Sequence, residues 1–164
     1  GHVLLPTEGL LEPGQPVPRC NCGQYGDVES YASLTGIRNN LLPYWLTRYP
    51  RHALHGVDPH QAARAVRGLG EQGDAMALKI FEQQARALGR LFTIASNFTD
   101  PDAYFVGGGV VEAAPSFRDW YLKQVADSTT LRDEQRAAAV FAVVPDLDMA
   151  GARGSAIAAL AALS

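Results

Sequence analysis

The chain has 164 residues, of which 47% are hydrophobic and 19% charged, and its formal net charge is -3. This length allows one domain with a sizeable core, and the composition is typical of a globular protein. The charges form no basic block, which argues against nucleic-acid binding by this segment, and no apolar run reaches the ~20 residues of a membrane-spanning helix.

The first half of the chain is predicted to contain a short strand, a long loop and two helices. The strand covers residues 1–5, and four prolines and four glycines make residues 6–26 an irregular loop. Loops of this length are usually functional or held in place by a specific interaction. Apolar residues at helical spacing after Asp27 predict a helix over residues 27–47, which Pro43 is expected to break or kink. Asp58 and Pro59, as N-cap and first helical residue, predict a helix over residues 58–69.

The second half is predicted to alternate helices and strands, so that the whole is a helix-rich mixed α/β structure. The predicted helices cover residues 74–98, 115–128 and 150–164, and the predicted strands cover residues 103–106 and 137–145. Gly89, in the middle of the longest helix, indicates close packing with a neighbour. The last helix is small and apolar enough to be buried on most sides.

The start of the chain, GHVLLPTEGL, has neither the basic region nor the cleavage site of a signal peptide. Because it lacks a methionine and begins in a strand-like pattern, we expect it to start inside a larger protein. The cysteines are spaced C-x-C, which would give a strained disulfide at best. A reducing, cytoplasmic setting is therefore predicted.

Cys20 and Cys22 lie in the long loop, just before a predicted helix, and are the only cysteines. Two thiolates at this spacing are candidate metal ligands, although C-x-C is less specific than paired C-x-x-C units. The candidates for the remaining ligands are one aspartate and four histidines: Asp27, His2, His52, His55 and His60. His2 lies at the far end of the loop, so a metal held there would close it. The alternative is two unrelated loop cysteines and solvated histidines.

Gly-His, a proline- and glycine-rich loop and then CNCGQYGDVESYAS resemble the signature of the ROK family of repressors, open reading frames and sugar kinases. In that family a histidine and three cysteines hold a structural zinc, and the histidine and a glutamate contact the sugar. The resemblance implies that His2, Cys20 and Cys22 are zinc ligands. It also implies that His2 and Glu29 contact a sugar, and it puts Asp27 where the third cysteine is expected.

Asp27 is the departure from the family pattern. A carboxylate oxygen binds Zn²⁺, so one histidine, two cysteines and one aspartate make a chemically sound set. Alternatively, Asp27 is only a helix cap. The loop between His2 and Cys20 is also longer than is usual in the family.

Gly107, Gly108 and Gly109 follow a predicted strand. Three glycines let the backbone approach a ligand closely, and backbone N–H groups can face phosphate or ribose, although a plain tight turn also accounts for them. The stretch over residues 71–113 and the closing DMAGARGSAIAAL also resemble the family, so the resemblance covers nearly the whole chain. It implies that these glycines contact ATP.

The resemblance implies a fold for residues 1–164: the C-terminal lobe of an actin-like, ribonuclease H-like ATPase, helix-rich with a mixed sheet. The D-x-G-x-T phosphate loop and the catalytic aspartate beside an asparagine are absent from this sequence. The chain by itself is therefore not expected to phosphorylate anything.

The implied function is part of a hexose kinase that uses ATP with Mg²⁺, acts on glucose or an N-acetylated relative and forms a homo-oligomer. One alternative is a sugar-sensing regulator of the same family. Nucleic-acid binding is expected only under this alternative. A third interpretation is a metal-stabilised interaction module that binds neither sugar nor nucleotide.

Overall fold

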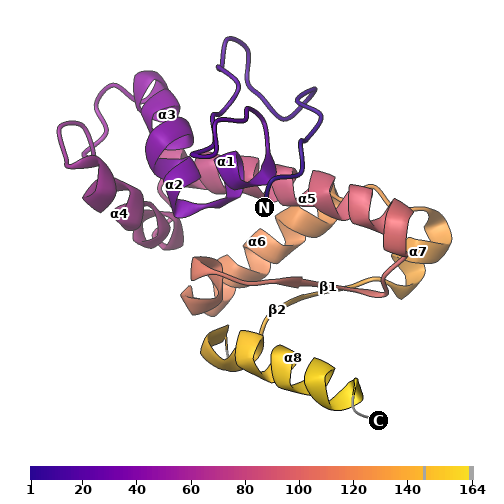
Figure 1. Ribbon diagram of the computed structural model, residues 1–164. Coiled ribbons are helices and arrows are strands. Elements are labelled where there is room, and N and C mark those ends of the chain that lie inside the picture. The colour runs from indigo at the N-terminus through magenta and orange to yellow at the C-terminus, as the bar shows by residue number, and fades with distance from the viewer. Residues whose placement is uncertain (146, 163–164) are drawn as a thin grey trace.

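The computed structural model describes residues 1–145 and 147–162. In chain order its elements are α1 (Val28–Ala32), α2 (Leu34–Gly36), a π-helical turn (Ile37–Leu41), α3 (Leu42–Arg48), α4 (Pro59–Glu71), α5 (Ala75–Thr99), β1 (Ala103–Val106), a 3-10 helix (Gly109–Glu112), α6 (Pro115–Ser128), α7 (Asp133–Ala138), β2 (Val140–Val143) and α8 (Leu147–Ala161). The arrangement is a helix-rich α/β structure with a small parallel sheet (Figure 1).

The long helix α5 is the centre of the fold, and α1, α3, α4 and α6 pack against it (Figure 1). Its N-cap, Asp74, accepts a hydrogen bond from the amide of Ala77 at 2.9 Å. Its buried face includes Met76, Ile80 and Phe81, which are at most 4% exposed. The predicted helices over 58–69, 74–98 and 115–128 are confirmed, with ends that differ by no more than about two residues.

The segment predicted as a helix over 27–47, with a break or kink at Pro43, is divided into several short pieces. Ser33 has an extended backbone, and its hydroxyl accepts from the amide of Gly36 at 2.9 Å, so it ends α1 and begins α2. Pro43 lies in the first turn of α3, where a missing N–H leaves no bond unmade. The prediction of helical residues is confirmed. The interruption expected at Pro43 is a π-helical turn that runs into α3, and the extended break lies earlier, at Ser33.

The sheet consists of β1 and β2, which run in parallel with Ala103 opposite Val140. Phe92 of α5 packs on Tyr104, and Tyr104 stacks on Phe141 with ring centroids 4.9 Å apart in both pairs, so α5 covers one face of the sheet. A mixed sheet was expected; in the described residues antiparallel pairing is confined to two isolated bridges.

The C-terminal helix α8 lies on the other side of the sheet from α5 (Figure 1). The sequence predicted a helix buried on most sides, and this is wrong for the described residues: Ile157 and Leu160 are 67% and 69% exposed. Helix α7 precedes β2 where only a longer strand was expected. No helix in the described part of the chain has both the length and the apolar composition that a membrane crossing requires.

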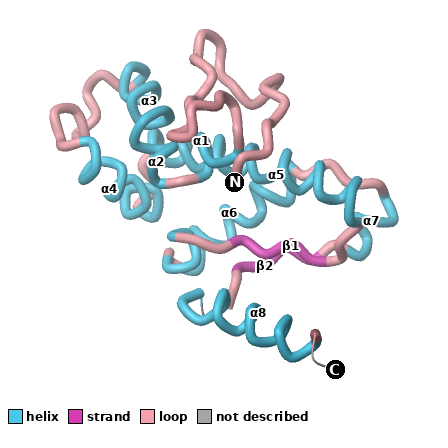
Figure 2. Tube along the Cα trace, in the orientation of Figure 1, coloured by secondary structure: helices cyan, strands magenta, loops and turns pink. Residues whose placement is uncertain are grey.

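The predicted strand over residues 1–5 is reduced to one bridge, and the segment up to α1 is loop (Figure 2). This loop is fastened to α5. Gln83, which is fully buried, donates to the carbonyl of Leu10 at 3.0 Å and to the side chain of Gln15 at 2.6 Å. Two further contacts come from Arg86, which pairs with Glu12 at 3.2 Å, and from Arg90, which donates to the carbonyl of Glu8 at 3.0 Å.

Candidate metal and sugar site

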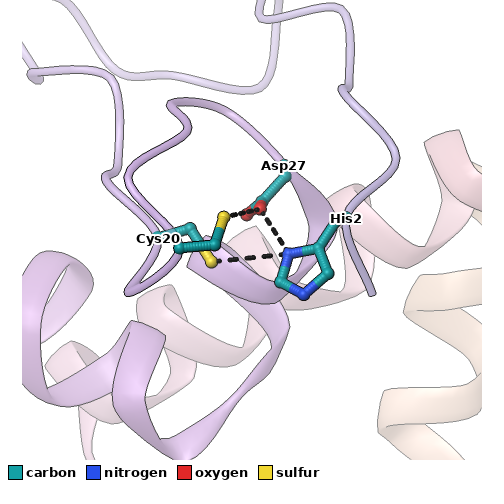
Figure 3. A group of neighbouring side chains, drawn as sticks. His2, Cys20 and Asp27 are labelled. Carbon is teal, nitrogen blue, oxygen red and sulfur yellow. Dashed lines mark hydrogen bonds and ion pairs between the residues drawn. The ribbon is translucent and has the colours of Figure 1, made fainter.

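The side chains of His2, Cys20, Cys22 and Asp27 lie together at the start of α1. Figure 3 labels His2, Cys20 and Asp27. One ligand atom from each lies within 4.8 Å of the other three. His2 Nδ1 is 3.0 Å from Asp27 Oδ2 and 3.6 Å from the sulfur of Cys20. The sulfur of Cys22 is 3.7 Å from Asp27 Oδ2. These four residues could hold a metal ion, and we call them the metal-ligand group for that reason.

Backbone pairing holds His2 in this group. The first residues run antiparallel to the start of α1, with a bridge between Leu4 and Asp27. The amide of Glu29 donates to the carbonyl of Gly1 at 2.8 Å. The residues on both sides of His2 are thus tied to the helix start, and this brings its ring to Asp27 although the two are 25 residues apart.

A small hairpin presents the two cysteines. Arg19 and Tyr25 form an antiparallel bridge, and the amide of Gly23 donates to the carbonyl of Cys20 at 3.0 Å. Gly23 has a φ of +96°, a conformation that favours glycine. Both cysteines are free thiols; Cys20 is buried and Cys22 exposed. The CNCG sequence therefore turns both sulfurs toward the same point.

Asp27 is fully buried, and its two carboxylate oxygens have different partners. Oδ1 accepts from the amide of Ser30 at 2.8 Å, which caps α1. Oδ2 faces His2 and Cys22. Asp27 is therefore a helix cap and a member of the metal-ligand group at once.

The electrostatics of the group favour a charged Asp27 and a neutral Cys20. Burial acts to raise the pKa of Asp27, but hydrogen bonds, led by that from His2, outweigh it and lower the pKa. The backbone N–H of Cys22 lowers the pKa of the Cys20 thiol. Burial and hydrogen bonds with Asp27 and Cys22 together exceed that effect and raise the pKa to about 11. Binding of a metal ion must therefore displace the proton of this thiol.

The metal-ligand group fits a zinc ion in size and chemistry. Zinc bonds of ~2.0–2.3 Å in a tetrahedron separate neighbouring ligand atoms by about 3.3–3.8 Å. Three of the separations here are 3.0, 3.6 and 3.7 Å, and all lie within 4.8 Å. One imidazole nitrogen, two sulfurs and one carboxylate oxygen are all donors that zinc accepts.

The other histidines considered as ligands lie outside this group. His52 Nδ1 accepts from the amide of Leu54, so its Nε2 donates to Asp74 at 3.2 Å. His55 bonds the carbonyl of Tyr49 at 3.1 Å. In the described residues, no second group of this kind includes either of them or His60.

Glu29 lies beside the metal-ligand group. Its carboxylate approaches Gly1, where a Cβ atom would come within 3.0 Å of Glu29 Oε2. Both Glu29 and His2 are exposed, and the His2 side chain is 58% exposed although its Nδ1 faces Asp27. The two residues expected to contact a sugar are thus close in space and open to solvent.

The glycine run ends β1 and leads into the 3-10 helix. Gly108 has a φ of +83°, which explains a glycine at that position, and Gly107 and Gly109 are exposed on either side. Arg67 of α4 holds this loop, because its Nη1 donates to the carbonyl of Gly109 and to the carboxylate of Glu112, both at 2.8 Å. Arg67 could not be found from local sequence, since its partners lie more than forty residues away.

The glycine run also lines a cleft of about 630 Å³ between α5, β1 and α4. Its walls are largely apolar and include Phe81, Leu88, Leu91, Phe92 and Phe105. None of the residues of the metal-ligand group lines it. The two sequence signals, the cysteine hairpin and the glycine run, therefore lie at separate places on the molecule.

A profile of the ROK family matches residues 1–162. The chain belongs to the ROK family. It is 35% identical over 116 residues to an N-acetyl-D-glucosamine kinase of Escherichia coli O6:H1, an alignment that covers 67% of this chain and 33% of the relative. The chain thus spans about a third of the length of the curated relatives it matches.

Solved structures of ROK proteins share the fold. A ROK family glucokinase from Streptomyces griseus, in complex with glucose and AMPPNP, matches with a TM-score of 0.59 and 24% identity over 88% of this chain and 44% of its own. A ROK family transcriptional regulator, a homologue of the E. coli MLC protein, matches with a TM-score of 0.59 and 21% identity over 87% of this chain and 33% of its own. The expected actin-like ATPase fold is confirmed, and the fold is common to ROK kinases and a ROK regulator.

Proposed function

We propose that this chain is the C-terminal lobe of an ATP-dependent ROK hexose kinase in which His2 and Glu29 hold the sugar. The observation that supports it most directly is the position of Glu29 against Gly1, beside a histidine whose ring is half open to solvent. The relative at 35% identity is a kinase of an aminosugar, which favours a kinase over a regulator.

In this proposal the two ring nitrogens of His2 have different roles. Nδ1 faces Asp27 Oδ2 and the sulfur of Cys20. With Nδ1 bound to a metal, the proton is on Nε2, which can donate to a sugar hydroxyl. The exposed Glu29 carboxylate accepts from sugar hydroxyls. The His2 and Glu29 side chains together would orient the sugar ring.

His2, Cys20, Cys22 and Asp27 would hold a structural Zn²⁺, which supplies a cross-link between the two ends of the long loop. In a cytoplasmic setting both thiols stay reduced and available as ligands. The cross-link would preserve the spacing between His2 and Glu29.

We assign Gly107, Gly108 and Gly109 to the nucleotide, which would enter as ATP with Mg²⁺. Exposed glycine backbone lets N–H groups approach phosphate or ribose. Arg67 keeps the loop in place through the carbonyl of Gly109. The phosphate loop and the base that takes the sugar proton would come from the rest of the parent protein, which we expect to be a homo-oligomer.

The test is ADP release by the full-length parent protein with ATP, Mg²⁺ and a panel of glucose, mannose, fructose and N-acetylhexosamines. Hydrogen bonds to a charged group are worth about 1.5–3 kcal/mol, so Glu29→Ala should lower kcat/KM by roughly 10- to 100-fold. Glu134→Ala, an exposed change on α7, is the control and should leave kcat/KM unchanged. Sugar binding without turnover on any sugar would instead identify a regulator.

A further inference from the structure

The two oxygens of Asp27 join the metal-ligand group to α1. Oδ1 accepts from the Ser30 amide at 2.8 Å, and Oδ2 lies 3.0 Å from His2 Nδ1 and 3.7 Å from the sulfur of Cys22. The side chain is fully buried, so neither oxygen can exchange its partner for bulk water. We infer that Asp27 is a positioning residue: it binds the metal ion through Oδ2, caps α1 through Oδ1, and so makes metal binding set the start of the helix that carries Glu29.

This inference rests on the proposed function and deepens it. A carboxylate has two oxygens and about four lone-pair sites, so it can accept an amide hydrogen bond and bind a cation together. The single sulfur of a cysteine at this position would bind the ion more tightly, but sulfur is a weak acceptor for the helix amide. Aspartate in place of the third cysteine therefore lowers the affinity for the metal but connects the ion to the helix.

Helix α1 is short enough for this connection to matter. It has five residues. Besides the bond to Oδ1, the Asp27 carbonyl accepts from the Ser30 hydroxyl at 2.6 Å and from the Ser30 amide at 3.1 Å. Glu29 lies between these two residues, and its amide is bound to Gly1, the neighbour of His2. An ion bound by both His2 and Asp27 therefore fixes Glu29 from the helix side and from the N-terminal side.

Two substitutions separate the two roles of Asp27 in the full-length protein. Asp27→Asn keeps an oxygen for the Ser30 amide but replaces the ligand oxygen with an NH₂ group that cannot bind a cation. Asp27→Cys keeps a metal ligand but loses the cap. Cys22→Ser is the control, because it removes a different ligand and leaves Asp27 intact.

Metal binding is measured by Co²⁺ titration, with Zn²⁺ competition for affinity. The thiolate-to-cobalt absorption should report two sulfurs in the unchanged protein and three in Asp27→Cys. Asp27→Asn should keep two sulfurs and bind Zn²⁺ at least about tenfold more weakly. Asp27→Cys should bind Zn²⁺ more tightly than the unchanged protein.

Hydrogen exchange of a peptide covering residues 28–36 measures the connection. Zn²⁺ should slow exchange several-fold in the unchanged protein. It should have little effect in Asp27→Asn, where the cap persists without the ligand, or in Asp27→Cys, where the ligand persists without the cap.

Each contrary result has one meaning. Unchanged Zn²⁺ affinity in Asp27→Asn, together with loss of affinity in Cys22→Ser, would make Asp27 a cap alone and overturn the inference while the metal site stands. If Zn²⁺ does not slow hydrogen exchange over residues 28–36 in the unchanged protein, the inference is also overturned. If Cys22→Ser binds Zn²⁺ normally, the metal assignment in the proposed function fails and the inference fails with it; the Glu29→Ala kinetics still test the sugar site independently.

Discussion

Gly89 of α5 lies against Ser128, the last residue of α6. A Cβ atom at this position would be 2.5 Å from the carbonyl oxygen of Ser128 and 2.6 Å from its Cβ atom. Both helices are tightly packed, and a backbone carbonyl cannot rotate away as a side chain can. The sequence predicted close packing at this glycine, and the approach of Ser128 confirms it.

We expect Gly89→Ala to lower the free energy of unfolding of the full-length protein by roughly 1–3 kcal/mol, because α6 must move to admit the methyl group. Urea unfolding measures it. Gly68→Ala is the matched control: Gly68 is also inside a helix, and a Cβ atom there meets nothing within 4 Å. Alanine should be neutral or stabilise α4 by up to about 1 kcal/mol. Equal effects of the two changes would contradict the close approach.

At the scale of elements, the helices with strong local signals were the ones predicted well. Asp58 and Asp74 cap α4 and α5 through their side chains, and Pro115 begins α6. These signals lie within a few residues of the boundaries they set. The breaks over residues 28–48 and the exposure of α8 depend on what packs beside each segment, which local sequence does not state.

The sequence predicted which residues come together at the candidate site better than it predicted what contacts their atoms make. The resemblance and the C-x-C spacing pointed to the four residues that the structure brings together. The division of the two Asp27 oxygens could not be predicted, because cap and ligand had been considered as alternatives. Gln83 was also missed: it is a polar residue on the buried face of α5, and only the fold shows that the long loop and Trp45 of α3 supply its partners.

The long loop has two separate attachments, so we expect its halves to respond differently to metal removal. Residues 19–27 contain three members of the metal-ligand group and would be tied down by the proposed ion, whereas residues 8–15 are bonded to α5 through Gln83 and Arg90. A chelator should speed hydrogen exchange in peptides over 19–27 and leave 8–15 unchanged. Gln83→Leu is the complementary variant and should speed exchange over 8–15. Joint opening of both halves on chelation would mean that the loop is one cooperative unit.

At the scale of the whole molecule, apolar surface remains uncovered around the sheet. In the described residues β1 and β2 pair only with each other, and a two-stranded sheet is marginally stable alone. Phe105 of β1 is 57% exposed and lines the apolar cleft. Parallel sheets are normally covered on both faces. Under the proposed function, in which this chain is one lobe of a kinase, the rest of that kinase would cover this surface.

Substitution of Phe105 tests this expectation, because the effect of a charge on the free energy of unfolding depends on whether the site is buried. An exposed side chain tolerates substitution within about 0.5 kcal/mol, whereas burying a carboxylate among apolar groups costs at least about 2 kcal/mol. Phe105→Asp should therefore lower the unfolding free energy of the full-length protein by about 2 kcal/mol or more. Phe105→Leu, which stays apolar, should cost clearly less. If both variants unfold at the same urea concentration as the unchanged protein, β1 stays exposed in the parent, and the cleft is a surface open to ligands or partners rather than an interior face.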